Sequence, residues 1–206
     1  MTGKLLIARH HESEWNGEGL WTGTRDVHLT QYGFKKSEEM GGLIADIRID
    51  RAYASKQVRA IETLSSMLTV LGLYHLPVDY VSALNERDYG DYTGKNKWEM
   101  EKLLGKKKFE HVRRDWDYPV PGGETLAQVY ERVVPFYRET IVPLLDEENN
   151  ILLVSHGNAL RALMVYIESI PKDEAKHLEM LFGAVIIYDV TPEGCMTNKE
   201  VRQVIP

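Results

Sequence analysis

Cysteine and long apolar runs are almost absent from this sequence. Its one cysteine, Cys195, cannot form an intramolecular disulfide or, alone, a cysteine cluster for zinc. No apolar run approaches the ~20 residues that a membrane-spanning helix needs, and the residues after Met1 do not resemble a secretory signal. We therefore expect a cytoplasmic protein that has no membrane partner.

Positive charge is also in deficit. The 25 Lys and Arg residues against 31 Asp and Glu residues give a formal net charge of −6, which argues against nucleic acid as a partner because phosphate backbones select basic surfaces. A local group of arginines can still bind a small anion inside an acidic protein. With 206 residues, 43% of them hydrophobic and 27% charged, the composition is typical of a globular protein, and we expect a single domain over residues 1–206.

Short apolar runs that alternate with helical periodicity indicate the fold class. The predicted strands are residues 5–8, 52–54, 78–80, 151–154 and 185–188. The predicted helices are residues 31–46, 57–72, 98–115, 124–145 and 158–169. Because strands and helices alternate, the sequence predicts a three-layer α/β sandwich with a mostly parallel central sheet.

Prolines set two further expectations about this fold. Pro135 and Pro143 lie inside the predicted helix 124–145, where a missing N–H group and the proline ring should kink or end the helix. The tail beyond Pro192 follows the last predicted strand, and we expect it to be loosely held.

Two of the predicted strands lead directly into a histidine. Arg9-His10 follows the run 5–8, and Ser155-His156 follows the run 151–154. Ligands of open α/β sheets bind outside the carboxyl ends of the strands, so neighbouring parallel strands would bring both imidazoles into one crevice. A lone histidine after a strand is more often a polar surface residue, but two at equivalent strand ends favour a functional site.

The residues around these histidines favour an anion as the ligand. A helix that starts at Gly157 would direct free backbone N–H groups toward the same crevice. Arg9 offers a planar fork of donors that suits phosphate oxygens, whereas Arg59 follows another strand end and either reaches this crevice or lies in solvent. Since no Asp-rich or His-rich spacing of metal ligands is present, we expect no metal.

Motifs along the chain resemble those of one family. The run Arg9-His10-His11-Glu12-Ser13-Glu14-Trp15-Asn16 is similar to the Arg-His-Gly-Gln/Glu-Ser-x-x-Asn motif of the histidine phosphatase superfamily. Further stretches resemble its cofactor-dependent phosphoglycerate mutase branch, and these are residues 21–30, 54–63, 84–97, 113–114, 123–135 and 155–161. The likeness runs from about residue 5 to residue 188, nearly the whole chain.

This resemblance implies an isomerase that interconverts 2- and 3-phosphoglycerate in glycolysis and gluconeogenesis. It implies that His10 carries the phosphoryl group as phosphohistidine, that 2,3-bisphosphoglycerate is the priming donor, and that Glu86 exchanges the proton. The residues implied as catalytic are His10, Glu86, His156, Arg9 and Arg59. The residues implied in substrate binding are Arg9, Asn16, Thr22, Gly23, Arg59, Glu86, Arg87, Asp88, Tyr89, Lys97, Arg113, Arg114, Gly157 and Asn158. A homodimer is left open.

Other interpretations remain open beside this one. The same histidine scaffold could serve a phosphatase of small phosphorylated metabolites, in which water takes the phosphoryl group from His10, or a binding protein without turnover. Without the resemblance, Glu86 would be interpreted as a surface glutamate paired with Arg87, and Arg113-Arg114 as part of a solvated helix face.

Three departures from the family pattern bear on these alternatives. His11 stands where the family usually has glycine, and Leu181-Phe182-Gly183 replaces a more polar segment. The chain between Arg114 and Pro121 is also shorter than in typical mutases, which bears on the pocket lid and on subunit contacts. Because glycine is the usual residue at position 11, we expect His11→Gly to retain activity.

Overall fold

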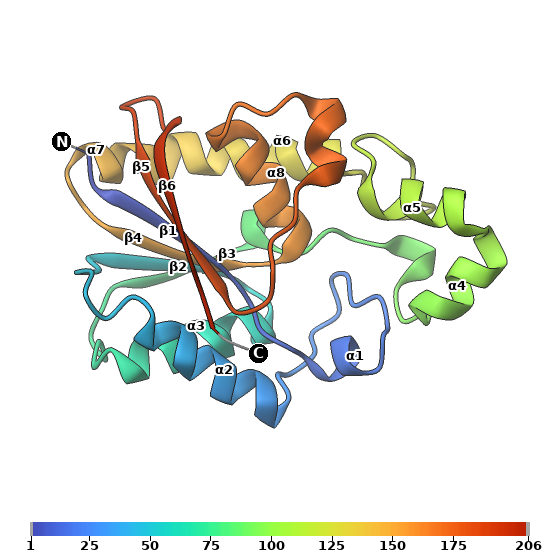
Figure 1. Ribbon diagram of the computed structural model, residues 1–206, viewed down its shortest axis with the longest axis horizontal. Helices are drawn as coiled ribbons and strands as arrows, with labels where there is room; N and C mark the ends of the chain where they lie inside the picture. Colours follow the sequence, from blue (N-terminus) through green and yellow to red (C-terminus); the bar gives the residue numbers. More distant parts are fainter. Residues whose placement is uncertain (1, 205–206) are drawn as a thin grey trace.

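A mixed six-stranded sheet lies between two layers of helices in the computed structural model, which describes residues 2–204 (Figure 1). The strands are β1 (Lys4–Arg9), β2 (Arg51–Ser55), β3 (Val78–Val81), β4 (Ile151–Ser155), β5 (Ala184–Val190) and β6 (Met196–Gln203). Their order across the sheet is β3-β2-β4-β1-β5-β6. The first four of these are mutually parallel, whereas β5 is antiparallel to β1 and β6 is antiparallel to β5. The predicted three-layer sandwich with a mostly parallel sheet is therefore confirmed.

The central strands are apolar on both faces because helices cover both. Along β1, Leu5 and Ile7 pack into the core on one side of the sheet, and Leu6 and Ala8 pack into the core on the other. All four side chains are fully buried, as the period of two along a strand requires when both faces are covered.

The helices divide between the two faces and one end of the sheet. They are α1 (Glu14–Gly17), α2 (Gln31–Gly42), α3 (Val58–Val70), α4 (Lys97–Leu104), α5 (Lys106–Arg114), α6 (Leu126–Phe136), α7 (Val142–Asp146) and α8 (Gly157–Ile167). Short 3₁₀ segments are η1 (Ser82–Leu84), η2 (Gly90–Tyr92) and η4 (Lys172–His177). In Figure 1, α2 and α3 cover one face, α6 and α8 cover the other, and α4 and α5 extend from one end.

Pro135 and Pro143 interrupt the predicted helix 124–145 without breaking its helical path. Helix α6 ends one residue after Pro135, and a π turn, η3 (Tyr137–Ile141), then leads directly into α7. Pro143 lies in the first turn of α7, where its missing N–H group leaves no bond unmade. The predicted interruption is confirmed, although the chain keeps a helical path through it.

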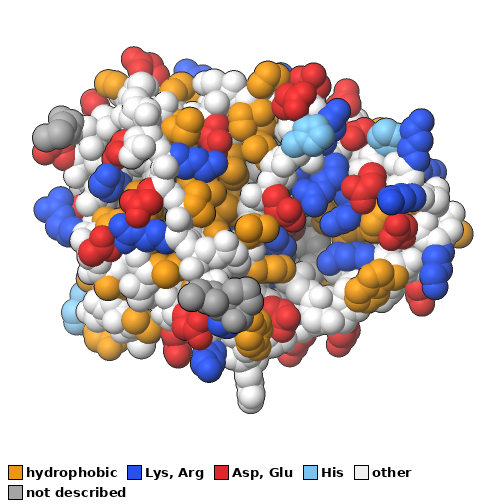
Figure 2. All heavy atoms as spheres, in the orientation of Figure 1, with side chains coloured by type: hydrophobic (Ala, Val, Ile, Leu, Met, Phe, Trp, Pro, Cys, Tyr) orange, Lys and Arg blue, Asp and Glu red, His pale blue; other side chains and the backbone are white. Residues whose placement is uncertain are grey.

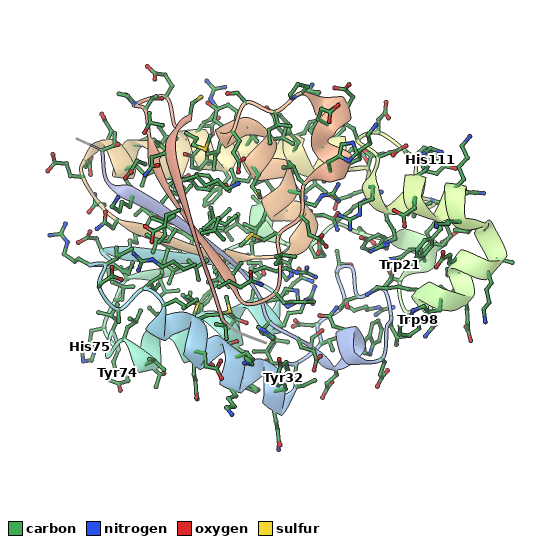
Figure 3. The ribbon with its side chains drawn as sticks, in the orientation of Figure 1. Trp21, Tyr32, Tyr74, His75, Trp98 and His111 are labelled. Carbon is green, nitrogen blue, oxygen red and sulfur yellow. The ribbon has the colours of Figure 1, made fainter. Side chains whose placement is uncertain are left out.

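Helices α4 and α5 form a cap that has its own apolar cluster. The cluster is centred on Trp21, which is buried and stacks on Tyr89 and Phe109 with ring centroids 5.4 and 5.6 Å away. Figure 3 shows the Trp21 ring lying inward of both helices. The single helix predicted over 98–115 is wrong, because Gly105 adopts a left-handed φ of +75° between the two helices.

The expectation of a loosely held tail beyond Pro192 is also wrong. Residues Met196–Gln203 pair with β5 along its length and form the last strand of the sheet. The side chains of β6 are mostly exposed, so the strand is held by backbone pairing with β5 and by polar bonds of Lys199 and Arg202. No helix among residues 2–204 is long and apolar enough to cross a membrane. That residues 1–206 form a single domain stays a prediction.

Candidate active site

The histidines that follow β1 and β4 lie side by side. Arg9 pairs with Ser155 in the parallel register, and the backbone N–H of His10 donates to the Ser155 carbonyl at 2.9 Å. The two imidazole centroids, of His10 and His156, are 4.9 Å apart with an interplanar angle of 57°. The expectation that these two strand ends share one crevice is confirmed.

His10 presents one unprotonated ring nitrogen, Nε2, to the pocket. Its Nδ1 lies 2.6 Å from the His11 carbonyl oxygen, and since a carbonyl only accepts, Nδ1 carries the proton. The Arg59 Nε–H group donates to Nε2 of His10 at 3.3 Å. Burial lowers the pKa of His10 well below its usual range, and Arg59 and Arg9 lower it further. The ring is therefore neutral and its Nε2 is nucleophilic.

His156 is fixed from behind by a hydroxyl of β2. Its Nε2 lies 2.6 Å from Ser55 Oγ, which also accepts the backbone N–H of Gln57 at 3.2 Å. Among the described residues Nε2 is the one acceptor within reach of the Ser55 hydroxyl proton, so the hydroxyl donates to Nε2 and the neutral ring carries its own proton on Nδ1. Burial, followed by the charge of Arg59, lowers the pKa of His156 well below its usual range. Its Nδ1 has no hydrogen-bond partner among the described residues, so it is a free donor.

Two arginines flank the His10 ring. Arg59 is fully buried and donates from Nη1 to the Arg25 carbonyl at 2.8 Å and from Nη2 to the Gly23 carbonyl at 2.9 Å. Burial lowers the pKa of Arg59 to about 10, which leaves it charged at neutral pH. Arg9 donates from Nη1 to the Met180 carbonyl at 3.0 Å. The sequence left open whether Arg59 reaches the crevice or lies in solvent. Its bonds to the carbonyls of Arg25 and Gly23 turn it inward to the crevice.

The loop at Thr22 and Gly23 closes one side of the pocket. Gly23 has a left-handed φ of +53°, and a Cβ there would lie 3.0 Å from Thr93 Oγ1. Its carbonyl accepts from Gln57 Nε2 at 3.0 Å as well as from Arg59. The side-chain oxygen of Gln57 also accepts the backbone N–H of Glu86 at 2.6 Å. One amide side chain therefore links this loop to Glu86.

Glu86, which follows η1, is buried against the N-terminus of α8. Its Oε1 accepts from the backbone N–H of Asn158 at 3.2 Å, from Asn158 Nδ2 at 3.2 Å and from the backbone N–H of Arg87 at 2.8 Å. Asn158 Nδ2 also donates to the hydroxyl of Tyr89 at 3.0 Å. These bonds hold the carboxylate with one edge toward the pocket, which is not the arrangement of a surface glutamate.

The cap supplies cations to the same pocket. Lys97 begins α4, and Arg113 and Arg114 end α5. Burial, together with the charges of Arg9 and Arg113, lowers the pKa of Lys97 to about 8. Arg114 donates to the Leu178 carbonyl at 3.3 Å and lies 3.5 Å from Glu179. Figure 2 shows Lys and Arg side chains gathered on the side of the molecule where Figure 1 places α5 and α8.

Most of the predicted site residues line one pocket. Those that do are Arg9, His10, Asn16, Thr22, Gly23, Arg59, Glu86, Tyr89, Lys97, Arg113, Arg114, Gly157 and Asn158. The same pocket is lined by four residues that were not predicted as site residues, and these are Trp21, Arg161, Glu179 and Met180. His156 is fully buried beside His10 and does not line the pocket wall.

Arg87 and Asp88 lie outside this lining and support the cap instead. The Arg87 guanidinium donates to the carbonyls of Glu124 and Val112 at 2.6 and 3.0 Å and is fully buried. The Asp88 carboxylate accepts the backbone N–H of Gly90 at 2.8 Å. Both side chains are directed to backbone groups, and that both residues contact substrate stays a prediction.

Arg161 is the most informative of the residues that sequence reasoning missed. It donates to the carbonyls of Arg113, Arg114 and Ala175 at 3.3, 3.0 and 2.9 Å. It therefore holds the end of α5 that carries two pocket arginines, as a cation at a helix C-terminus does. The available signal was a single arginine within the apolar helix α8.

Buried donors in the pocket wall and directly behind it fit a phosphorylated ligand. Arg9 Nε, His156 Nδ1 and Thr22 Oγ1 are buried and have no hydrogen-bond partner among residues 2–204. Guanidinium and imidazole donors suit phosphate oxygens. Within the described residues, no group of three His, Cys, Asp or Glu side chains could hold a metal ion.

Comparison with protein families gives a match to this arrangement. The model described as histidine phosphatase superfamily (branch 1) matches residues 5–201. The chain belongs to this superfamily.

Two curated relatives extend the comparison for this superfamily member. A 2,3-bisphosphoglycerate-dependent phosphoglycerate mutase of Cytophaga hutchinsonii is 40% identical over 185 residues, which are 90% of this chain and 86% of the relative. One of Chelativorans is 37% identical over 205 residues, which are 98% of this chain and 100% of the relative.

Solved structures of the superfamily share the fold. A mycobacterial glucosyl-3-phosphoglycerate phosphatase superposes with a TM-score of 0.81 at 19% identity, covering 98% of each chain. At this identity the likeness establishes the fold and not the reaction.

Proposed function

We propose that the protein is a phosphoglycerate mutase that interconverts 2- and 3-phosphoglycerate through a phosphohistidine at His10. The observation that carries this proposal is the neutral His10 ring, whose Nε2 faces the pocket between Arg59 and Arg9. An imidazole in this state can attack phosphorus in line. The names of the two curated relatives support the same reaction.

The residues around His10 have complementary roles in this proposal. Arg9, Arg59 and the Nδ1–H group of His156 stabilise the negative charge on the transferring phosphoryl group. Glu86 donates a proton to the departing substrate oxygen and accepts it back in the reverse step. Asn16 and Asn158 add neutral donors at the pocket wall.

The cap cations favour a mutase over a phosphatase. A phosphoglycerate carries a carboxylate as well as a phosphate, and Lys97, Arg113 and Arg114 line the pocket that contains His10. A mutase must hold its intermediate while it reorients and must exclude water. A wall of cations opposite one nucleophile supports that retention, whereas a phosphatase needs only the phosphoryl site.

The donor set also fits 2,3-bisphosphoglycerate, because cations lie both around His10 and on the cap. When bound, this compound supplies the phosphoryl group that primes His10. We propose that no metal takes part, and we expect activity to survive treatment with EDTA. A cytoplasmic location and a homodimer stay predictions.

Product analysis tests the proposal. Purified protein receives 3-phosphoglycerate with a trace of 2,3-bisphosphoglycerate, and phosphorus NMR follows the products. We expect 2-phosphoglycerate at equilibrium and no activity in His10→Ala. If glycerate and inorganic phosphate are the only products, the protein is a phosphatase.

Labelling separates turnover from binding alone. Phosphate-labelled 2,3-bisphosphoglycerate should leave acid-labile label on the wild-type protein and none on His10→Ala. Bound ligand without label on the wild type would support a binding protein and contradict both enzymatic alternatives.

A further inference from the structure

Two departures from the family pattern meet in the structure. His11 and Phe182 lie far apart in the sequence, yet their rings pack with centroids 5.6 Å apart at an angle of 39°. Phe182 also approaches His10 edge-on, with centroids 6.1 Å apart at 69°. One aromatic ring therefore contacts both residues of the His10-His11 pair.

Phe182 also contacts the phosphate-facing arginine. The Arg9 Cζ atom lies 3.7 Å from the Phe182 ring centroid, which is a close cation–π contact. Among residues 2–204 Arg9 forms no direct ion pair with a carboxylate, and Glu86 and Glu179 act on its charge only from a longer distance. Its Nε has no hydrogen-bond partner in that part of the chain. The guanidinium is thus held by an aromatic face and one carbonyl, that of Met180, rather than by an acid.

The absence of an acid partner has a chemical consequence. A carboxylate beside Arg9 would compete with phosphate for its donors, whereas an aromatic ring restrains the guanidinium and leaves its N–H groups free. The Phe182 ring packs against Arg9, and the Met180 carbonyl accepts a hydrogen bond only from Nη1 of Arg9. This contact therefore orients Arg9 without lowering its positive charge.

His11, which packs against the Phe182 ring, is itself held in place by Glu12 and Tyr32. Its Nδ1 accepts the backbone N–H of Glu12 at 2.8 Å, which fixes the orientation of the imidazole. The Tyr32 ring, which Figure 3 shows on α2, meets His11 edge-on with centroids 5.5 Å apart at 74°. Burial lowers the pKa of His11, so a neutral ring packs beside the Arg9 site and adds no repulsion.

We propose that Phe182 is a positioning residue that orients Arg9 for phosphoryl binding and that His11 braces Phe182. The pair acts through Arg9 and does not itself contact substrate. This inference rests on the proposed function only in assigning Arg9 to the phosphoryl group, which a mutase and a phosphatase share.

Binding of orthovanadate, measured by calorimetry, tests the proposal without requiring turnover. We expect Phe182→Leu to weaken vanadate binding about tenfold, because the aliphatic chain fills space but offers no π face. Phe182→Tyr keeps the face and should bind within about twofold of the wild type. Phe34→Leu is the matched control, since Phe34 is partly exposed on α2 and lies outside the pocket.

The contribution of His11 requires a double-mutant cycle. Glycine at position 11 is the family norm, but the contact with Phe182 changes our expectation, and His11→Gly should weaken vanadate binding about fivefold. Combined with Phe182→Leu, it should add almost nothing, because the brace acts through the ring. Losses that simply multiply would refute the role of His11.

Thermal unfolding is measured for every variant. Phe182→Leu with an unchanged unfolding temperature and unchanged vanadate affinity would overturn the proposal. Should Phe182→Leu fail to fold, Phe182→Met takes its place with the same expected loss, and unchanged affinity in Phe182→Met would overturn the proposal equally. If the wild type produces only glycerate and phosphate, the mutase assignment fails while the vanadate test of Phe182 remains decisive.

Discussion

Ser55 Oγ lies 2.6 Å from Nε2 of His156, so a hydroxyl at the end of β2 sets which nitrogen of a ring after β4 carries the proton. The two strands are adjacent and parallel, and this bond links their carboxyl ends beneath the pocket. It leaves the Nδ1–H group of His156 as an unpartnered donor without requiring a charged ring.

Removing this hydroxyl should impair the proposed reaction. We expect Ser55→Ala to lower kcat/KM about tenfold, roughly 1.4 kcal/mol of barrier, because the Nδ1 proton is no longer fixed on the pocket side. The free energy of unfolding should fall by about 1–3 kcal/mol as His156 Nε2 loses its buried partner. Steady-state kinetics and urea unfolding measure the two effects, and Ser66→Ala, which loses a hydroxyl bonded to the Glu62 carbonyl, is the control. Equal kinetics in both variants would contradict the assigned donor.

The buried histidines predict how stability depends on pH. The pKa values of His10 and His156 are lowered by burial, whereas the unfolded imidazoles have a pKa near 6.5. Below that pH the unfolded chain binds more protons than the folded chain, so stability is full above about pH 6.5 and is lost as pH falls. Each ring contributes up to about 1.4 kcal/mol per pH unit.

Urea unfolding at pH 7.5 and pH 5.5 measures this loss. The double variant His10→Gln, His156→Gln removes both titrating groups. Its free energy of unfolding should fall less between pH 7.5 and pH 5.5 than that of the wild type. An identical loss of unfolding free energy in both proteins would mean that these rings are not the source of the acid sensitivity.

Lys97 predicts a pH dependence of substrate binding in the alkaline range. Burial lowers the pKa of Lys97 to about 8. The side chain is therefore positively charged at pH 7 and loses this charge as the pH rises through about 8. The KM for 3-phosphoglycerate should therefore rise above pH 8, by up to about tenfold per pH unit once the group is neutral. The substrate phosphate is already fully ionised there, since its second pKa is about 6.

Lys97→Arg distinguishes this group from others that titrate nearby. An arginine stays charged throughout, so KM in this variant should be flat between pH 7 and pH 9. A rise equal to that of the wild type would assign the effect to another residue.

Glu179 lies at the pocket and pairs with Arg114, which we propose binds substrate. It is 3.5 Å from Arg114 and its side chain is 57% exposed. Exposed ion pairs are weak and are screened by salt, so we expect Glu179→Gln to lower KM about two- to fivefold at low ionic strength and less at high salt. Glu174→Gln is the control, because that exposed carboxylate pairs with His177 away from the pocket. A higher KM in Glu179→Gln would show that this carboxylate assists binding.

The sequence predicted five strands of the sheet and most of the pocket lining because both leave strong local signals. Strands β1 and β4 are apolar on both faces and stop at a polar pair, which is visible without the fold. The motifs around His10, Glu86 and His156 identified most of the pocket lining. The split between α4 and α5 was missed because Gly105 lies in a charged stretch that gives no other break signal.

The remaining differences come from long-range packing. Strand β6 has mostly exposed, polar side chains and is defined by its pairing with β5, so no alternating pattern reveals it. Arg87 matches the family motif, yet its direction toward Val112 and Glu124 depends on where the cap folds. The stacking of Phe182 on Arg9 joins residues that no local pattern relates.

The position of β1 has a consequence for how the chain acquires its shape during synthesis. This strand is made first, yet both of its neighbours, β4 and β5, come from the last third of the chain. Pairings between such distant segments close slowly because of their loop entropy. Strand β1 therefore lacks both of its partners until Ile151–Ser155 has been synthesised, and its apolar side chains stay exposed to non-native contacts in that interval.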